Sequence, residues 1–301
     1  MEKKIINLIK DNGPLTGSEI WEVVGGDGLI LWRTCKRSQY LTIRTAGTHY
    51  LRLDRRLKGF TRLSPSIFRE FLTYSVVGLS GDVNSLEKRI GSVASHIEEI
   101  SKSKVELAFR VISGLSSRLV TERPLNEDAC FIIAGDIVYN MAHDVPRPER
   151  STGKLVNGSD MDIVVIMNDE CGEDLIKRLD NAIYQEKYRL LIAPHIREEI
   201  DYIVKDLARV REQLRFDSFR HILACKILQE GTLLYGSEDI FHSVKSMLRD
   251  KGVTAKLEGL ERLARVFRRD AEQYLLREDP DKIIDESLYL FYPTEESEEF
   301  E

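Results

Sequence analysis

The sequence predicts an α+β chain, with a small mixed sheet between a helix-rich N-terminal part and a helical C-terminal region. Two short apolar segments, one within 129–136 that ends at a glycine and one at 163–166, have the length and composition of buried strands. Before and after them, most apolar residues recur at the three- and four-residue spacing of amphipathic helices. A few strands flanked by runs of helices are typical of the α+β class.

Composition limits the classes of protein that need to be considered. The 301 residues are 42% hydrophobic and 31% charged, enough for two or three domains with a core. No apolar segment approaches the roughly 20 residues of a membrane span, and the N-terminus is too charged for a secretory signal. The four cysteines (Cys35, Cys130, Cys171, Cys225) are far apart, which argues against a disulfide framework or structural zinc site. We therefore expect a cytoplasmic protein without a membrane partner.

Residues 1–65 carry the pattern of three short helices followed by a hairpin. The first helix has an apolar stripe of Ile5, Ile6, Leu8 and Ile9 and ends at a Gly-Pro turn, and two further short helices follow. Two alternating segments, 40–44 and 49–53, are separated by Ala-Gly and predict a β-hairpin.

Three helices and a hairpin resemble a winged-helix domain. The chain has a net charge of −6, which excludes a uniformly basic nucleic-acid binder but not a local basic surface. In the winged-helix interpretation such a surface contains the third helix and the hairpin. Its predicted nucleic-acid contacts are Arg33, Lys36, Arg37, Arg44 and Arg52. The alternative is a domain for protein contact or dimerisation, with these residues simply solvated.

Residues 66–128 are predicted to be a helical linker. Their apolar residues keep helical spacing, and the Gly-Leu-Ser-Gly at 78–81 interrupts the segment.

Residues 129–206 hold the candidate chemistry. The first strand ends at Gly135, and Asp160 and Asp162 stand at the start of the second. Because strand side chains alternate, the two carboxylates point to the same side and repel each other unless a cation neutralises them. Hard oxygen ligands favour Mg²⁺ or Mn²⁺ as that cation.

A third carboxylate belongs to a segment with two interpretations. After a predicted helix, residues 200–205 alternate as a strand would, and Asp201 then joins the first two acids from a neighbouring strand. The same segment is also compatible with one continuous helix. In the strand interpretation, three carboxylates hold two metal ions.

This order of strand, glycine, polar spacer, Asp-x-Asp strand and later Asp resembles the nucleotidyltransferase fold of DNA polymerase β, the CCA-adding enzymes and the aminoglycoside nucleotidyltransferases. The resemblance covers about residues 130–205 and implies an enzyme that transfers a nucleoside monophosphate from an NTP to a hydroxyl, releasing pyrophosphate. It implies that Asp160 and Asp162 bind both metal ions. It further implies that Asp201 binds the catalytic metal and deprotonates the acceptor.

The sequence departs from the family where the triphosphate is held. The family has a second small residue after the glycine, whereas Asp136 follows Gly135 here. A carboxylate near a triphosphate is unfavourable without an intervening cation. Either the loop residues Arg147, Arg150, Lys154 and Ser159 take over the phosphate contact, or the site binds nucleotide poorly. The predicted nucleotide-binding residues are Gly135, Asp136, Arg150, Lys154, Ser159 and Lys226. Lys226 either points to the triphosphate or is solvated.

The departure keeps a second function open, a non-catalytic regulator that senses a nucleotide and binds DNA. Residues 207–285 are predicted to be all helical, forming the acceptor side of a cleft or a dimer surface. Residues 286–301 are an acidic tail, most simply a solvated terminus. The acceptor and the preferred NTP do not follow from the sequence.

Overall fold

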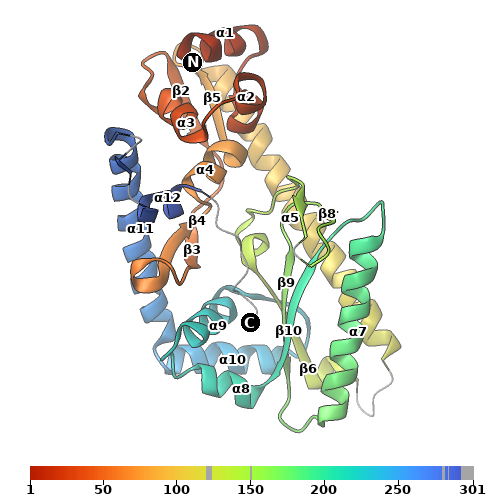
Figure 1. Cartoon of the computed structure of the whole chain (residues 1–301). Coiled ribbons are helices and arrows are strands. Elements are labelled where there is room, and N and C mark those ends of the chain that lie inside the picture. Colours follow the sequence, from red (N-terminus) through yellow and green to blue (C-terminus); the bar gives the residue numbers. More distant parts are fainter. Residues whose placement is uncertain (120–123, 150, 280–281, 284, 293–301) are drawn as a thin grey trace. The chain divides into compact units, whose positions relative to one another are not determined.

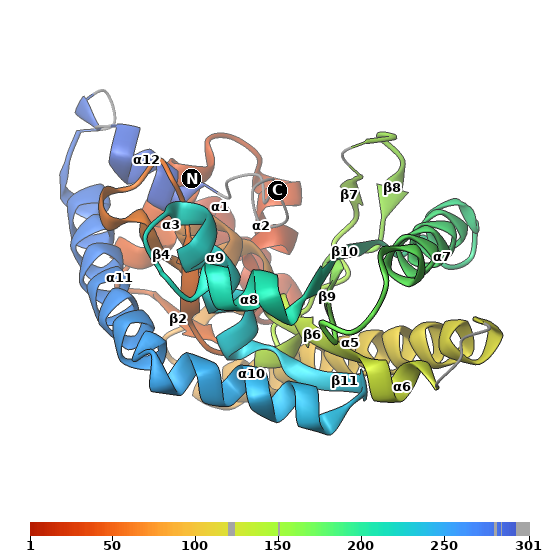
Figure 2. The ribbon, with the colours of Figure 1, turned by 90° about the horizontal axis from the view of Figure 1, so that it is seen from below.

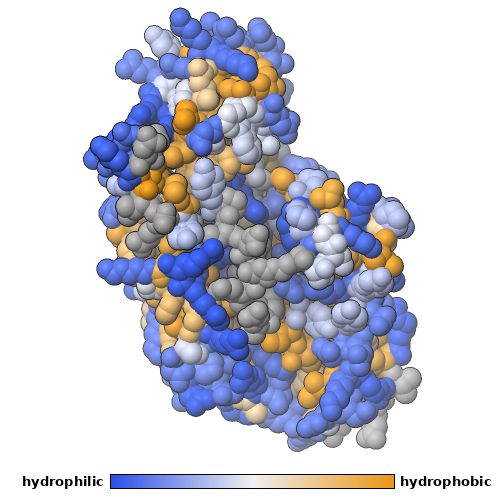
Figure 3. All heavy atoms as spheres, in the orientation of Figure 1, coloured by the Kyte–Doolittle hydropathy of each residue, from blue (hydrophilic) through white to orange (hydrophobic). Residues whose placement is uncertain are grey.

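A computed structural model describes residues 1–119, 124–149, 151–279, 282–283 and 285–292. It is a mixed α+β structure with small sheets, as predicted (Figure 1). The described chain divides into two compact units, residues 1–97 with 258–292, and residues 98–257. None of the described helices is both long and apolar enough to cross a membrane. Hydrophilic side chains dominate the surface seen in Figure 3.

The first unit begins with the three predicted helices, α1 (Glu2–Asn12), α2 (Gly17–Val24) and α3 (Gly28–Arg37). Helix α2 starts with a capping box in which Thr16 and Glu19 satisfy each other's backbone N–H groups. These helices bury Ile5, Ile20 and Trp32 in the core of this unit.

The strand pairing of the first unit differs from the prediction. Strand β2 (Leu41–Thr45) pairs with β5 (Ser75–Leu79), and β5 also pairs with β1 (Leu15–Thr16). Strand β3 (Tyr50–Leu53) pairs instead with β4 (Thr61–Ser64). The predicted hairpin between 40–44 and 49–53 is therefore wrong.

The predicted helical linker, residues 66–128, is wrong at β5, because this segment pairs with β1 and β2 as a strand. Val76 and Val77 are fully buried in the middle strand of a three-stranded sheet, an environment that suits β-branched residues better than a helix does. The other linker elements are mostly helical: α4 (Ile67–Arg69), the π-helical turn Glu70–Tyr74, and α5 (Val83–Arg118).

The first unit also contains the 3₁₀ turn Lys58–Phe60, most of helix α11 (Val253–Arg277) and helix α12 (Asp285–Phe291). Phe291 on α12 is fully buried in the core of this unit, so the prediction of a solvated tail is wrong at α12. Residues 293–301 of that predicted tail lie outside the described residues.

The second unit is built on one four-stranded sheet with strand order β10-β9-β6-β11. Strands β6 (Ala129–Ala134) and β9 (Met161–Met167) are antiparallel, and β10 (Ile200–Asp206) lies parallel to β9. All three were predicted, and β10 settles the choice between strand and helix for Asp201. Strand β11 (Thr232–Gly236) pairs with β6, so the prediction that 207–285 is all helical is wrong there.

Helices cover this sheet on both faces. The remaining elements of the unit are α6 (Leu125–Asp128), the 3₁₀ turn Gly135–Tyr139, β7 (Arg147–Pro148), β8 (Leu155–Val156), α7 (Glu173–Ile192), α8 (Leu207–Gln213), α9 (Phe219–Glu230) and α10 (Glu238–Asp250). Leu179 and Ile183 of α7 belong to one buried cluster with Ile163 and Val165, on one side of the sheet. Helices α8 and α9 lie on the other side from α7 (Figure 2). Alternation along β9 places Asp162 on that other side.

Candidate metal centre

Three carboxylates meet where β9 and β10 begin. Asp160 directly precedes β9, Asp162 is its second residue, and Asp201 is the second residue of β10. The parallel register sets Asp162 opposite Asp201, so both side chains point to the same face. One carboxylate oxygen from each of the three residues lies within 4.8 Å of the others. The structure therefore brings together the three acids that the sequence predicted.

The donor set fits a divalent cation. Asp162 is only 6% exposed, and the other two acids are partly exposed, so a ligand has access from solvent. Three negative charges this close repel each other, and partial burial strengthens the repulsion. Carboxylate oxygens are the ligands that Mg²⁺ and Mn²⁺ prefer.

Gly135 lies against this cluster at the end of β6. Its φ is +75°, a conformation that costs other residues strain. A Cβ at this position would lie 2.1 Å from Oδ2 of Asp162, which is a severe clash. The glycine therefore allows the turn after β6 to approach Asp162, and the close approach requires the absence of a side chain.

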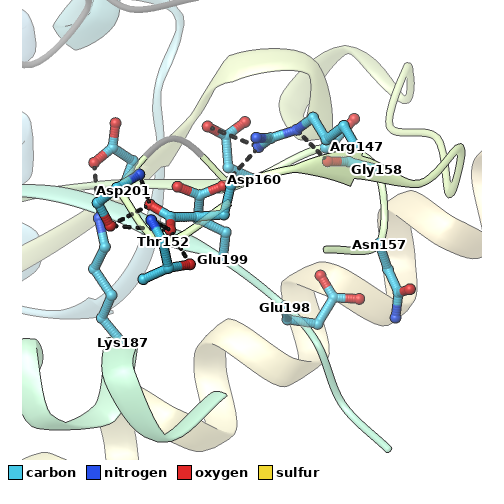
Figure 4. Close-up of polar contacts among 12 residues, drawn as sticks. Arg147, Thr152, Asn157, Gly158, Asp160, Lys187, Glu198, Glu199 and Asp201 are labelled. Carbon is cyan, nitrogen blue, oxygen red and sulfur yellow. Dashed lines mark hydrogen bonds and ion pairs between the residues drawn. The ribbon is translucent and has the colours of Figure 1, made fainter. Parts of the chain in front are cut away.

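Two cationic side chains reach the cluster from outside the two strands (Figure 4). Arg147 Nη2 lies 3.4 Å from Oδ2 of Asp160 and 2.9 Å from a carboxylate oxygen of Glu199. Lys187 Nζ on α7 lies 3.3 Å from Oδ1 of Asp201. The protein itself thus supplies positive charge to two of the three acids.

Glu199 is a site residue that the sequence reasoning missed. It is buried, and burial raises the pKa of its carboxyl although Arg147 and Lys187 oppose that rise. The available signal was its position two residues before Asp201, which places both side chains on the same side of an extended segment. Its neighbour Glu198 binds the buried Lys104, whose Nζ also donates to the Asn157 carbonyl at 2.8 Å.

The spacer between Gly135 and Asp160 contains the β7–β8 hairpin. Its turn is closed by Glu149, whose carboxylate accepts hydrogen bonds from the N–H and hydroxyl groups of Ser151 and Thr152. Burial alone raises the pKa of Glu149, but these hydrogen bonds outweigh it and lower the pKa from 4.5 to about 2. Lys154, a predicted phosphate contact, is exposed at the end of this turn. Arg150, another one, lies outside the described residues.

Ser159 and Asp136 contact each other. The Ser159 hydroxyl donates to Oδ2 of Asp136 at 2.6 Å and accepts from the His143 N–H at 3.1 Å. Next to them, a Cβ on Gly158 would lie 1.8 Å from the His143 carbonyl oxygen. Ser159 and Asp136, which were both predicted to contact the nucleotide, thus help to close the base of the spacer.

Lys226 is buried on α9, so its interpretation as a solvated lysine is wrong. Its Nζ lies 2.8 Å from Oε1 of Glu230, and the two side chains are 5% and 3% exposed. Glu230 also accepts from the Tyr139 hydroxyl at 2.9 Å and from the Gly135 N–H at 3.4 Å. This buried ion pair therefore borders the turn that touches Asp162.

The basic residues predicted for the first unit do not share one environment. Arg33 and Arg52 are buried, 6% and 7% exposed, and Arg33 Nε donates to the Leu275 carbonyl on α11. Lys36, Arg37 and Arg44 are exposed, and Arg44 pairs with Glu87 at 3.2 Å. Burial argues against nucleic-acid contact by Arg33 and Arg52.

Comparison with known proteins does not assign the chain to a family. No protein-family model and no curated protein matches the chain.

Proposed function

We propose that this chain is a metal-dependent nucleotidyltransferase that moves a nucleoside monophosphate from an NTP to a hydroxyl acceptor. The observation that carries the proposal is the meeting of Asp160, Asp162 and Asp201 within 4.8 Å, on neighbouring parallel strands. Gly135, held at φ +75° against Asp162, agrees with the glycine that precedes the spacer in the nucleotidyltransferase pattern.

In this proposal Asp160, Asp162 and Asp201 hold the divalent ions. Ions bound there supply charge stabilisation for the attacking and leaving oxygens. Asp201 is the outermost of the three acids, on the edge strand β10, and takes the proton of the acceptor hydroxyl. The acceptor oxygen forms a bond to the α-phosphorus while the bond between that phosphorus and the bridging oxygen breaks, and pyrophosphate leaves.

The contact between Ser159 and Asp136 concerns the position at which this chain has an aspartate and the nucleotidyltransferase pattern has a small residue. A carboxylate that accepts a hydroxyl hydrogen bond at 2.6 Å within the spacer is engaged by the protein itself. We propose that Asp136 acts there as a structural residue, and that exposed Lys154 contributes positive charge toward the triphosphate. Substitution of Lys154 by methionine then weakens NTP binding but leaves metal binding unchanged.

Thermal unfolding tests the site without knowledge of the acceptor. The midpoint is recorded with ATP, GTP, CTP or UTP, each with Mg²⁺ or EDTA, for the wild type and Asp160→Asn/Asp162→Asn. A ligand at a hundred times its dissociation constant stabilises by about 2.7 kcal/mol, which is readily measured. We expect a Mg²⁺-dependent shift with at least one NTP and none in the double variant. Without ligands, the double variant should unfold at a higher temperature, because it removes like-charge repulsion.

Transfer of label from the α-phosphate of the selected NTP then tests the reaction. Asp162→Asn should lower transfer by more than about 100-fold, since even residues that only support metal ligands cost 10–100-fold. Asp169→Asn is the matched control, because Asp169 is an aspartate two residues beyond the C-terminal end of β9 that pairs with Arg211 at 2.6 Å. Nucleotide-dependent stabilisation that survives in Asp162→Asn, together with salt-sensitive duplex binding, would favour the regulator instead.

A further inference from the structure

The carboxylate cluster is partly neutralised by the chain's own cations. Arg147 comes from β7 and Lys187 from α7, and neither belongs to the strands that carry the acids. Their side chains are 26% and 22% exposed, so both are largely withdrawn from solvent at the cluster. Each contacts a different acid, Asp160 in one case and Asp201 in the other.

Arg147 is held in place by groups other than Asp160. Its Nε donates to the Gly158 carbonyl at 2.7 Å, and its Nη2 lies 2.9 Å from Glu199. The distance to Asp160, 3.4 Å, is the longest of the three. A ligand that takes Asp160 leaves the hydrogen bond to Gly158 and the ion pair with Glu199 in place, so the guanidinium remains beside it as a fixed positive charge.

Lys187 differs in that its ammonium group is carried on a flexible stem. Its contact with Asp201 is 3.3 Å long and does not require a particular orientation of a planar group. This side chain can therefore turn away from Asp201 when another cation approaches.

We propose that Arg147 and Lys187 compete with the divalent ion for the carboxylates and so lower the affinity of the site for metal. The inference rests on the metal site of the proposed function. Without an ion, the two side chains reduce the repulsion among Asp160, Asp162 and Asp201. With an ion, they are like charges within a few ångströms of it, and this repulsion weakens its binding. By reciprocity, metal binding loosens the contact between Arg147 and Asp160 by the same factor.

Titration with Mn²⁺ alone, followed by electron paramagnetic resonance of the free ion, tests the proposal without nucleotide or acceptor. Arg147→Met and Lys187→Met should each bind Mn²⁺ about five- to tenfold more tightly than the wild type, because each removes one nearby positive charge. Arg147→Lys keeps the charge and should stay within about twofold of the wild type. Arg211→Met removes an arginine paired with Asp169, outside the cluster, and should leave Mn²⁺ affinity unchanged.

The outcomes separate this inference from the proposed function. If the wild type binds Mn²⁺ and both methionine variants bind it equally or more weakly, the competition is refuted and the metal site stands. Weaker binding in Arg147→Met would mean that the arginine orients Asp160 for the metal. If only the methionine variants bind Mn²⁺, the competition is supported in its strongest form. If no variant binds Mn²⁺, both the inference and the proposed enzyme are overturned.

Discussion

The acidic residues of the second unit and the basic residues of the first make an instructive contrast. Three acids predicted to act together, Asp160, Asp162 and Asp201, do converge within 4.8 Å. The five basic residues predicted to form one surface are divided between buried and exposed positions. The acids depended on strand alternation and on the register of two neighbouring strands, whereas the basic surface depended on a hairpin that does not form.

The contrast teaches that a charged residue in a sequence is not necessarily a surface residue. Arg33 lies on α3 directly after Trp32, one of the largest fully buried side chains of the unit. Its guanidinium donates to a carbonyl of α11, and burial lowers its pKa. Acids that converge on a cluster suggest a ligand, whereas this arginine connects two helices within its unit.

The largest effect is expected from Gly135→Ala. The new methyl group meets Oδ2 of Asp162 at 2.1 Å and the backbone keeps a positive φ, so the variant should lose about 3 kcal/mol of unfolding free energy. Urea unfolding measures this loss. Gly153→Ala is the matched control, since Gly153 has φ +67° and a methyl group added there would meet nothing within 4 Å.

The control should lose only about 1 kcal/mol, the cost of the backbone conformation by itself. Equal losses in the two variants would show that the turn after β6 moves away from Asp162 at little cost. The close approach of Gly135 to Asp162 would then contribute nothing measurable to the free energy of unfolding.

A smaller effect is expected from Arg33→Met. The substitution removes the hydrogen bond to Leu275 and leaves its carbonyl without this donor, so unfolding free energy should fall by about 2 kcal/mol. Affinity for a DNA duplex, measured by fluorescence polarisation at two salt concentrations, should not change. If affinity fell while stability stayed constant, Arg33 would belong to a surface after all, and the contrast between the two units would fail.

The sequence predicted most of the site because its signals are local. Asp160 and Asp162 stand two residues apart before a β-branched run, and Ile200, Tyr202 and Val204 alternate around Asp201, so the strand period predicted the face of each strand on which the acids lie. The parallel register of β9 and β10 then brings them together. The strands that the sequence did not predict depend on pairing with segments far away in the chain. Residues 75–79 and 232–236 became strands because each found a partner strand far away in the chain, β2 and β6 respectively.

The contacts that side chains of the spacer and of α7 make with the acids also could not be predicted from local sequence patterns. The sequence offered Arg147 only as one of several spacer residues that could contact phosphate, and Lys187 is one of many helical lysines. Their positions follow from the closure of the spacer by Ser159 and Gly158 and from the packing of α7. Such contacts are a property of the tertiary structure.

The smallest effect is expected from Glu149→Gln, which tests how firmly the hairpin beside the acidic site is closed. Glutamine keeps a carbonyl oxygen as acceptor but loses the charge, so the variant should be less stable by about 1 kcal/mol at pH 7. The folded-state pKa of Glu149 lies near 2, below its usual 4.5, so its contribution is complete above pH 4.5 and lost as pH falls toward 2.

The stability difference between wild type and Glu149→Gln should therefore shrink below pH 4.5. Glu173→Gln serves as control, because the Glu173 side chain is 89% exposed and its ion pair with Lys177 lies on the surface of α7. A difference that stays constant down to pH 2 would contradict the hydrogen-bonded closure of the turn.

The packing of Gly135 on Asp162 also has a consequence for how this chain can diverge. While the aspartate is present, any side chain at position 135 collides with it, so substitutions there are removed by selection for folding. Loss of Asp162 to a smaller residue removes this collision and leaves only the smaller cost of the positive φ at position 135. In descendants that give up the acidic cluster, the aspartate should therefore be lost first and the glycine only afterwards. The order of the substitutions at positions 162 and 135 along a lineage would then show when the acidic site was lost.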